Sequence, residues 1–461
     1  MGRPFTLYRF LASPPPTVLG LTILVDLGVC PGFDVFRRVL GGEEVTVGDG
    51  LVKALDTARS IFESEASRRR IYGYCSGLGA LMDRSGVCSP EWEHSVLVEH
   101  AVGVGPLAPP EVSRLFLFVR LLQMSQGLEP VRGLLALRIA DALNSGITPL
   151  VPVRGSLGAS GDLTPSAHAF LCIFRGVGLA LHRGSRVGCS EALKAEGLEV
   201  VELKPGEALA LINNTAWSTA LLAYSTLRLE DVIARSLNVA RSTLELCRCV
   251  EEHYGGAVSK VKRHPGVGLA LKMLDGLKCD NASRLQDPYS LRCTPFIYGA
   301  LLDLIEFSKD VVLREACSTT TNPIVVDGRV VHSCAFYSIH VAIISDMLAV
   351  GVAHIANAIE RRVVQLLRGD ITGLPDFLAV GTPVGSMIDG YVAASITARL
   401  RALATPHSIH SLPVSGMQED VVPHAGEAAL RLIEVVELLE ELVDVEERVA
   451  AKALSIKGGG S

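Results

Sequence analysis

The segment from Val153 to Pro165 could carry out unusual chemistry, because three small residues are consecutive in it: Ala159, Ser160 and Gly161. Gly161 has no Cβ, so its amide nitrogen can approach the carbonyl carbon of Ala159 at low steric cost. Ring closure with loss of water would give a five-membered imidazolone, and loss of a second water from Ser160 would leave an exocyclic methylidene. The backbone alone could therefore build a strongly electrophilic carbon here.

A plainer interpretation of this segment is a flexible loop before a helix, with Asp162 as the helix cap. Pro165 suits the first turn of such a helix. Ala-Ser-Gly is a common tripeptide, so these residues by themselves favour the plain interpretation. The chemical interpretation depends on the surrounding sequence and on the elements that must hold the loop.

Most of the chain has the periodicity of helices that are apolar on one face. The pattern predicts helices over 51–67, 93–102, 111–126, 134–144, 217–250, 295–315, 338–368, 385–404 and 425–454. A helix of 30 residues spans about 45 Å. Residues 324–331 look like a short strand pair, with Asp327-Gly328 as its turn. We therefore expect a mainly α fold: an elongated bundle of long helices with site-forming loops and minor β structure.

The sequence suggests four segments along the chain. We expect an irregular N-terminal segment over 1–50, an α-rich domain with the Ala159–Gly161 loop over 51–210, a long central helical bundle over 211–455 and a flexible tail over 456–461.

Composition narrows the classes of partner. The net charge is −6, and there is no basic stripe with aromatic residues of the kind that nucleic-acid-binding proteins use. No apolar run reaches the roughly 18 residues of a membrane span, so we expect no membrane partner. The eleven cysteines include no Cys-x-x-Cys pair, which argues against a metal site. We interpret them as mostly buried thiols in a reducing compartment, the cytoplasm, and a disulfide framework is not expected.

The string from Gly155 to His168 closely resembles the prosthetic-group loop of the histidine and phenylalanine ammonia-lyase family. Further segments resemble that family in the same order along roughly residues 45–430. They are Tyr72–Gly79, Ser95–Gly105, Leu211–Thr215, Gln286–Cys293, Thr321–Pro323 with Ala335–Tyr337, and Met417–Asp420. The resemblance implies a carbon–nitrogen lyase whose Ala159-Ser160-Gly161 becomes methylidene-imidazolone (MIO), with no external cofactor or metal.

The resemblance also implies catalytic roles outside the loop. Arg292 would clamp the substrate carboxylate through a two-pronged, charge-assisted pair. Tyr72 and Tyr289 are candidate bases, provided that a nearby cation or helix end lowers the phenol pKa from about 10. Without the resemblance, each tyrosine would be interpreted as an amphipathic core residue.

Other implied roles concern the ring and its support. Asn213 would donate a hydrogen bond to the prosthetic group or to the substrate, and Gln286 would support the ring carbonyl, where negative charge develops. Phe336 would pack on the ring. Asp162 would fix the loop or manage protons.

His100 and Glu419 bear on the substrate. In the resembled family, a histidine and a glutamate at these places accompany an imidazole-bearing substrate, and a carboxylate can pair with an imidazole. L-Histidine, converted to trans-urocanate and ammonia, is therefore the leading substrate. The alternatives are a lyase or aminomutase for phenylalanine, tyrosine or another amino acid, and a non-catalytic paralogue that serves as a helical assembly or binding protein.

The family's pattern is not followed everywhere. Departures stand at Cys75, Ser76, Leu78, Glu99, Cys317, Thr321, Ala335 and Tyr337. They leave the electrophile-forming string intact but put the substrate and the closure of the Tyr72 loop in doubt. The resemblance further implies a homotetramer in which several subunits share each active site.

Overall fold

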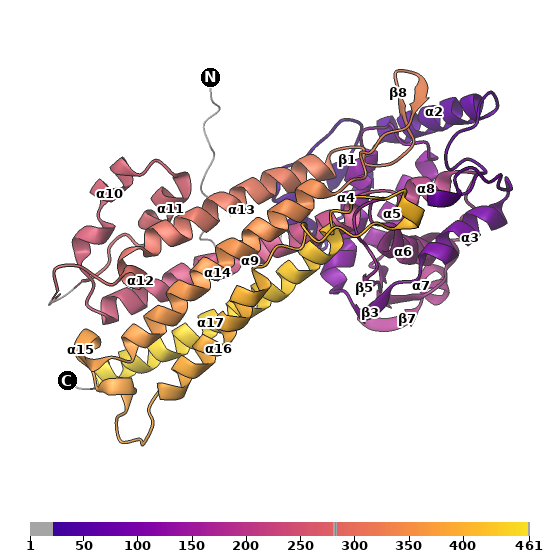
Figure 1. Cartoon of the computed structure of the whole chain (residues 1–461). Coiled ribbons are helices and arrows are strands. Elements are labelled where there is room, and N and C mark those ends of the chain that lie inside the picture. Colours follow the sequence, from indigo (N-terminus) through magenta and orange to yellow (C-terminus); the bar gives the residue numbers. More distant parts are fainter. Residues whose placement is uncertain (1–21, 280–281, 283, 460–461) are drawn as a thin grey trace.

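The computed structural model describes residues 22–279, 282 and 284–459. Long helices form an elongated bundle, and an N-terminal part with shorter elements sits at one end of it (Figure 1). The bundle helices are α9 (Ala216–Leu246), α13 (Thr294–Ala316), α14 (Ile339–Leu366), α16 (Met387–Leu403) and α17 (Ala425–Gly458). The predicted fold class, a mainly α elongated bundle with minor β structure, is confirmed.

The N-terminal part contains most of the short elements. Its helices are α1 (Val35–Leu40), α2 (Asp49–Ala66), α3 (Pro90–His100), α4 (Pro110–Met124), α5 (Gly133–Asn144), α6 (Leu163–Arg175), α7 (Cys189–Ala195) and α8 (Glu207–Ile212). Its strands are β1 (Ile23–Val25), β2 (Val45–Val47), β3 (Val104–Leu107), β4 (Thr148–Pro149), β5 (Pro152–Arg154), β6 (Leu179–His182) and β7 (Ser185–Gly188). The strands form small sheets: β1 pairs with β2 in parallel, β3 pairs with β5, and β4, β6 and β7 form an antiparallel sheet.

Short elements also decorate the bundle. They are α10 (Gly256–Val261), α11 (Pro265–Met273), α12 (Tyr289–Arg292), α15 (Gly369–Thr372) and the hairpin of β8 (Ile324–Val326) with β9 (Arg329–Val331). Asp327 and Gly328 both have positive φ, as the predicted hairpin turn requires.

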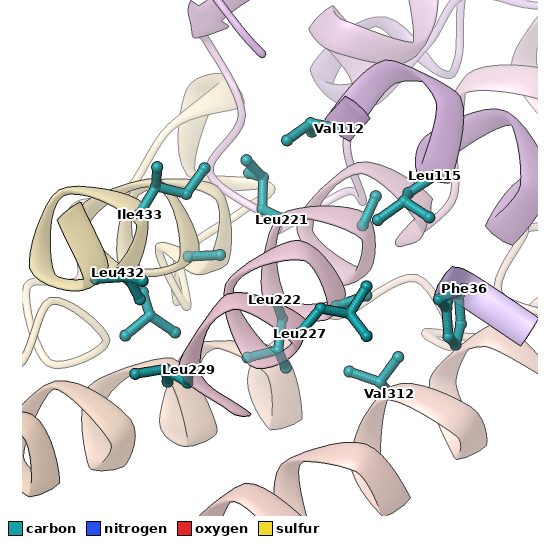
Figure 2. Packing of buried hydrophobic residues seen from close by; sticks show 14 of the residues in the cluster. Phe36, Val112, Leu115, Leu221, Leu222, Leu227, Leu229, Val312, Leu432 and Ile433 are labelled. Carbon is teal, nitrogen blue, oxygen red and sulfur yellow. The ribbon is translucent and has the colours of Figure 1, made fainter. Parts of the chain in front are cut away.

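Helix α9 lies at the centre of the apolar core. Leu221, Leu222 and Leu227 are among its buried side chains, which pack between residues of α4, α13 and α17 (Figure 2). A Leu→Ala change at such a site typically costs about 2–5 kcal/mol, because it leaves a cavity. The core therefore fixes α9, whose first turn contacts the loop that carries Ala159–Gly161.

Helix α14 is the one helix in the described part of the chain that is long and apolar enough to cross a membrane. Its most apolar window has a mean hydropathy of 1.8, and 61% of that window is buried inside the protein. It packs against α9, α13, α16 and α17. Its apolar surface is thus used within the bundle core.

The cysteines differ from the expectation. Four disulfide bonds join Cys30–Cys317, Cys75–Cys88, Cys172–Cys189 and Cys249–Cys279, with Cα–Cα distances of 5.0–5.7 Å. Cys247, Cys293 and Cys334 are free. The prediction of mostly buried thiols without disulfides was therefore wrong. Sequence spacing could not reveal these pairs, because folding brings together cysteines that are up to 287 residues apart.

Two predicted segments also differ at their ends. Residues 1–50 were expected to be irregular, but β1, α1 and β2 lie within this range; residues 1–21 are outside the described part. The predicted flexible tail starts at 456, whereas α17 continues to Gly458, and residues 460–461 are outside the described part. The other segment boundaries stay predictions.

Candidate active site

A pocket of about 640 Å³ brings together residues from five of the resembling motifs. From the first half of the chain, the pocket is lined by Tyr72, Ala159, Ser160 and Asn213, among others. From later in the chain come Asn322, His332, Cys334, Phe336, Tyr337, Gln418, Glu419, Asp420 and Val421. Six predicted site residues therefore share one cavity in a single chain: Tyr72, Ala159, Ser160, Asn213, Phe336 and Glu419.

Gly161 has a backbone that only glycine adopts comfortably at this place. Its φ is +72°, and a Cβ built on it would lie 2.4 Å from the carbonyl oxygen and 2.6 Å from the nitrogen of Asn214. Both distances are far below van der Waals contact. The close approach to the backbone of Asn214 thus requires glycine.

Asp162 ties the loop to the central helix α9. Its fully buried carboxylate accepts hydrogen bonds from Ser156 Oγ at 2.6 Å and from the backbone nitrogen and hydroxyl of Ser218 at 2.8 and 2.9 Å. Ser218 lies in the first turn of α9, so Asp162 caps α9 and not its own helix α6. Burial raises the pKa of Asp162, while the bonds from Ser156 and Ser218 oppose that rise.

Asn213 holds the carbonyl group of Ser160. It follows α8 directly, is 4% exposed, and its Nδ2 donates a hydrogen bond to Ser160 O at 2.6 Å. Its Oδ1 is buried without a hydrogen-bond partner in the described part of the chain. A buried acceptor without a partner is uncommon and marks a place where a ligand group can bind.

Helix α4 fixes the loop that carries Asn213. Arg120 forms a fully buried ion pair with Glu129, and it donates a hydrogen bond of 2.9 Å to the carbonyl oxygen of Ala210. Gln123 Nε2 donates to the hydroxyl of Thr215 at 2.9 Å. These contacts come from a helix inside the core, so the Asn213 side chain is held by a rigid element.

Glu419 lies next to the serine of the tripeptide. Its Oε1 accepts a hydrogen bond of 2.8 Å from Ser160 Oγ. The Ser415–Met417 turn and the pairing of the Val414 and Glu419 backbones fix this segment. A carboxylate thus stands beside Ser160, inside the pocket.

Tyr72 is held at both ends. Its backbone nitrogen donates to His332 Nε2 at 3.2 Å, and its hydroxyl oxygen accepts from the backbone nitrogen of Gly79 at 3.1 Å. Burial and then the charge of Glu419 raise the pKa of Tyr72, although the Gly79 N–H opposes this. Within the described part of the chain, the net effect of these groups is a raised pKa and not the decrease expected for a base.

Comparisons with known proteins identify the family of this chain. Residues 33–460 match the family model described as aromatic amino acid lyase. The histidine ammonia-lyase of Streptomyces avermitilis is 34% identical over 455 residues, which cover 95% of this chain and 89% of that protein. The chain belongs to the aromatic amino acid lyase family. The predicted family and the predicted carbon–nitrogen lyase class are thus confirmed.

Solved structures give the same fold. The ergothioneine-degrading ergothionase of Treponema denticola superposes with a TM-score of 0.89 at 25% identity, covering 95% of this chain and 90% of that chain. The phenylalanine aminomutase of Pantoea agglomerans superposes with a TM-score of 0.88 at 26% identity, covering 95% and 91%. The lyase therefore shares its architecture with proteins named for different substrates.

Three predicted site residues of the lyase do not reach this pocket within one chain. Gln286, Tyr289 and Arg292 belong to α12 and the segment before it, at the opposite end of the bundle from α6 and α8 (Figure 1). Tyr289 is 73% exposed, and Arg292 Nη1 donates to Gln286 Oε1 at 2.5 Å. Their roles stay predictions, and in this chain they lie apart from the pocket, with Gln286 and Tyr289 exposed and Arg292 half-buried.

His100 is also not among the residues that line the pocket. It ends α3, and its Nδ1 lies 2.6 Å from the carbonyl oxygen of Val96 one turn earlier. Its role in substrate choice stays a prediction.

His332 is a site residue that the sequence patterns did not indicate. His332 lines the pocket and accepts the Tyr72 N–H, which requires an unprotonated Nε2. Burial, with a smaller effect of Arg69, lowers the pKa of His332 and so favours this neutral form. A single histidine three residues before Ala335 carries no motif that would single it out.

The structure accounts for three of the departures from the family's pattern. Cys75 and Cys317 are each one half of a disulfide bond. Thr321 is fully buried and its hydroxyl donates to the carbonyl oxygen of Ala210 at 3.3 Å. Nothing in the structure explains Glu99, which is exposed.

Proposed function

We propose that this lyase removes ammonia from L-histidine and releases trans-urocanate. The observation that carries the proposal is the carboxylate of Glu419 in the pocket, 2.8 Å from the hydroxyl of Ser160. A carboxylate there can pair with the imidazole ring of a substrate that is bound at the reactive loop. The identity of 34% to a histidine ammonia-lyase over nearly the whole chain supports the same substrate.

We further propose that Ala159-Ser160-Gly161 matures into the MIO group. The residues present fit it: Gly161 approaches the Asn214 backbone as only glycine can, and Asn213 Nδ2 already holds the Ser160 carbonyl, which becomes the ring carbonyl. When formed, this group supplies an electrophilic carbon for the amino nitrogen of the substrate. The proposal includes no metal and no external cofactor.

The residues of the chain then have separate tasks. Asn213 holds the Ser160 carbonyl and stabilises negative charge that develops on its oxygen. Asp162 keeps the loop on the first turn of α9. Glu419 orients the imidazole, and Phe336 contributes an apolar wall of the pocket.

Removal of the substrate's Cβ proton needs a base, and Tyr72 is the candidate within the pocket. Because the pKa of Tyr72 is raised in the single chain, the phenolate form requires a cation from elsewhere. Arg292 is the proposed cation and carboxylate clamp, supplied with Tyr289 and Gln286 by another subunit. We therefore propose a homotetramer with shared active sites, without nucleic-acid or membrane partners.

The competing function is an MIO-dependent lyase or aminomutase with another substrate. The superposition on a phenylalanine aminomutase and on an ergothionase favours including those substrates in any test. Tyr337 and Cys334 also line the pocket.

We propose the cytoplasm as the compartment. The four disulfides would be reduced in most cytoplasms. The proposal therefore applies to a cytoplasm in which disulfides persist, as they do in hyperthermophilic archaea and bacteria.

Intact mass followed by product analysis tests the proposed function. MIO formation predicts a chain lighter by about two waters, and the purified lyase should then release urocanate from L-histidine, measured by ultraviolet absorbance. L-Phenylalanine, L-tyrosine and ergothioneine serve as the comparison panel. An unmodified mass would contradict MIO formation, and a higher kcat/KM for another member of the panel would reassign the substrate.

A further inference from the structure

The loop that carries Tyr72 closes on itself through a covalent bond. Cys75 and Cys88 form a disulfide across only 13 residues, with their Cα atoms 5.0 Å apart. Tyr72, Ser76, Gly79, Met82 and Asp83 from this region all line the active-site pocket. A bond that shapes residues 75–88 therefore also shapes one wall of the pocket.

Hydrogen bonds inside the loop lie next to the Cys75–Cys88 disulfide and join the same two arms of the chain. Gly86 N donates to Cys75 O at 2.8 Å, and Gly77 N donates to Arg84 O at 2.9 Å, so the two arms of the loop pair next to the disulfide. Between these arms lies Gly79, whose N–H holds the hydroxyl of Tyr72 at 3.1 Å. The position of the Tyr72 hydroxyl thus depends on the arms that the disulfide joins.

The backbone at Cys75 supports this interpretation. Cys75 has a φ of 50°, in the left-handed region that residues other than glycine normally avoid. Such a conformation persists where the surroundings fix it. Cys75 is fixed by the bond to Cys88 and by the hydrogen bond from Gly86, and the adjacent Ser76 Oγ accepts from Gly73 N at 3.0 Å.

We propose that Cys75 and Cys88 are positioning residues for the lyase reaction, and that their disulfide holds Tyr72 in place over the reactive loop. The inference rests on the proposed lyase function. It makes activity depend on the oxidation state of this pair. A dithiol can open it, because Cys88 is exposed. One thiolate of the dithiol attacks a cysteine sulfur and breaks the S–S bond; its second thiol then closes on the first, leaving two cysteine thiols and an oxidised, cyclic reagent.

The chain provides a matched control. Cys172 and Cys189 form a disulfide across 17 residues, joining the last part of α6 to the start of α7, and neither residue lines the pocket. The two covalent loops have similar lengths, so their removal has similar effects on the unfolded chain. A difference in kcat/KM between the variants that lack one or the other disulfide must then arise in the folded enzyme.

The experiment compares Cys75→Ser/Cys88→Ser with Cys172→Ser/Cys189→Ser in the full-length enzyme. We expect the first variant to lose about 10- to 100-fold in kcat/KM, because a shift of about 1 Å in a catalytic group has effects of this size. The second variant should lose melting temperature but keep its kcat/KM. Equal kcat/KM values for Cys75→Ser/Cys88→Ser and the wild type would overturn the inference.

A reversible measurement covers the case in which the serine variant fails to fold. The wild-type enzyme is treated with dithiothreitol, assayed, and reoxidised, and alkylation with mass mapping identifies which cysteines opened. We expect kcat/KM to fall when Cys75 and Cys88 become alkylatable and to return on reoxidation. Full activity with both cysteines alkylatable, or both cysteines free in the untreated enzyme, would overturn the inference.

The same data separate this inference from the proposed function. A wild-type enzyme of unmodified mass that acts on no amino acid overturns both. An active wild-type enzyme of the expected mass, with activity independent of the Cys75–Cys88 pair, overturns only the positioning role.

Discussion

Glu419 Oε1 lies 2.8 Å from the hydroxyl of Ser160, although the two residues are 259 positions apart in the chain. The contact joins the segment before α17 to the loop before α6. It places a negative charge where the proposed substrate would present its imidazole. The first prediction follows from this pair.

Glu419→Gln should lower kcat/KM for L-histidine by about 10- to 100-fold, because it removes a charge-assisted hydrogen bond worth roughly 1.5–3 kcal/mol. Asp420→Asn is the matched control, since it removes the same charge from the next residue, which also lines the pocket. Steady-state kinetics measure both variants. Equal losses in the two would mean that Glu419 has no specific role.

Asn213→Ala should reduce kcat by about 10²- to 10³-fold, as the loss of a single donor at a developing oxyanion does elsewhere. The donor in question is Asn213 Nδ2, 2.6 Å from Ser160 O. Asn213→Asp keeps the shape but cannot donate, so it should behave alike. Intact mass must accompany the kinetics, because it separates a defect in MIO formation from a defect in turnover. Undiminished kcat in a matured Asn213→Ala enzyme would contradict the role.

Glu93 should make the stability of the enzyme depend on pH. This carboxyl is 2% exposed and accepts hydrogen bonds from Gly206 N and Ala208 N, at the start of the helix that leads to Asn213. Burial raises the pKa of Glu93 from 4.5 to about 7. The folded state then binds a proton that the unfolded state has lost, so the free energy of unfolding should fall as pH rises from about 4.5 to about 7, by up to roughly 3 kcal/mol.

Denaturant titrations across that pH window, at one protein concentration, measure this effect. Glu93→Gln cannot titrate and should lack this part of the pH dependence. If the wild type and the variant show the same pH dependence, then Glu93 does not carry the proton.

Two inactive variants should restore activity when they assemble together. Ser160→Ala removes the serine of the loop, and Arg292→Ala removes the proposed clamp on α12, which lies far from that loop in the same chain (Figure 1). If each site combines Ser160 from one subunit with Arg292 from another, random mixed oligomers should recover about a quarter of the wild-type activity. The mixture is refolded together and assayed. Persistent inactivity of confirmed mixed oligomers would contradict shared sites.

Local patterns allowed much of the fold to be predicted. The expected helix over 217–250 is α9 at Ala216–Leu246, and the one over 295–315 is α13 at Thr294–Ala316. Asp327-Gly328 was correctly predicted as a hairpin turn. Apolar spacing and turn residues act within a few positions of the chain, so these elements follow from the sequence.

Contacts between distant segments could not be predicted in this way. Only the plain interpretation of the loop made Asp162 a cap of its own helix, and its carboxylate caps α9 instead, because the fold brings Ser218 next to it. His332 reaches Tyr72 across 260 positions. Likewise, no spacing rule pairs Cys75 with Cys88 rather than with another of the eleven cysteines. These features depend on tertiary packing.

The bond between Cys30 and Cys317 has a mechanical consequence for the enzyme. These residues join the segment before α1 to the end of α13, with Cα atoms 5.7 Å apart. A chain that is pulled by its two ends would pass the load through this bond. The polypeptide between them, which includes the Tyr72 loop, the Ala159–Gly161 tripeptide and Asn213, would remain outside the path of the force. Under tension, the described residues before Cys30 and the helices after Cys317 would therefore extend while the Ala159–Gly161 tripeptide stays unloaded.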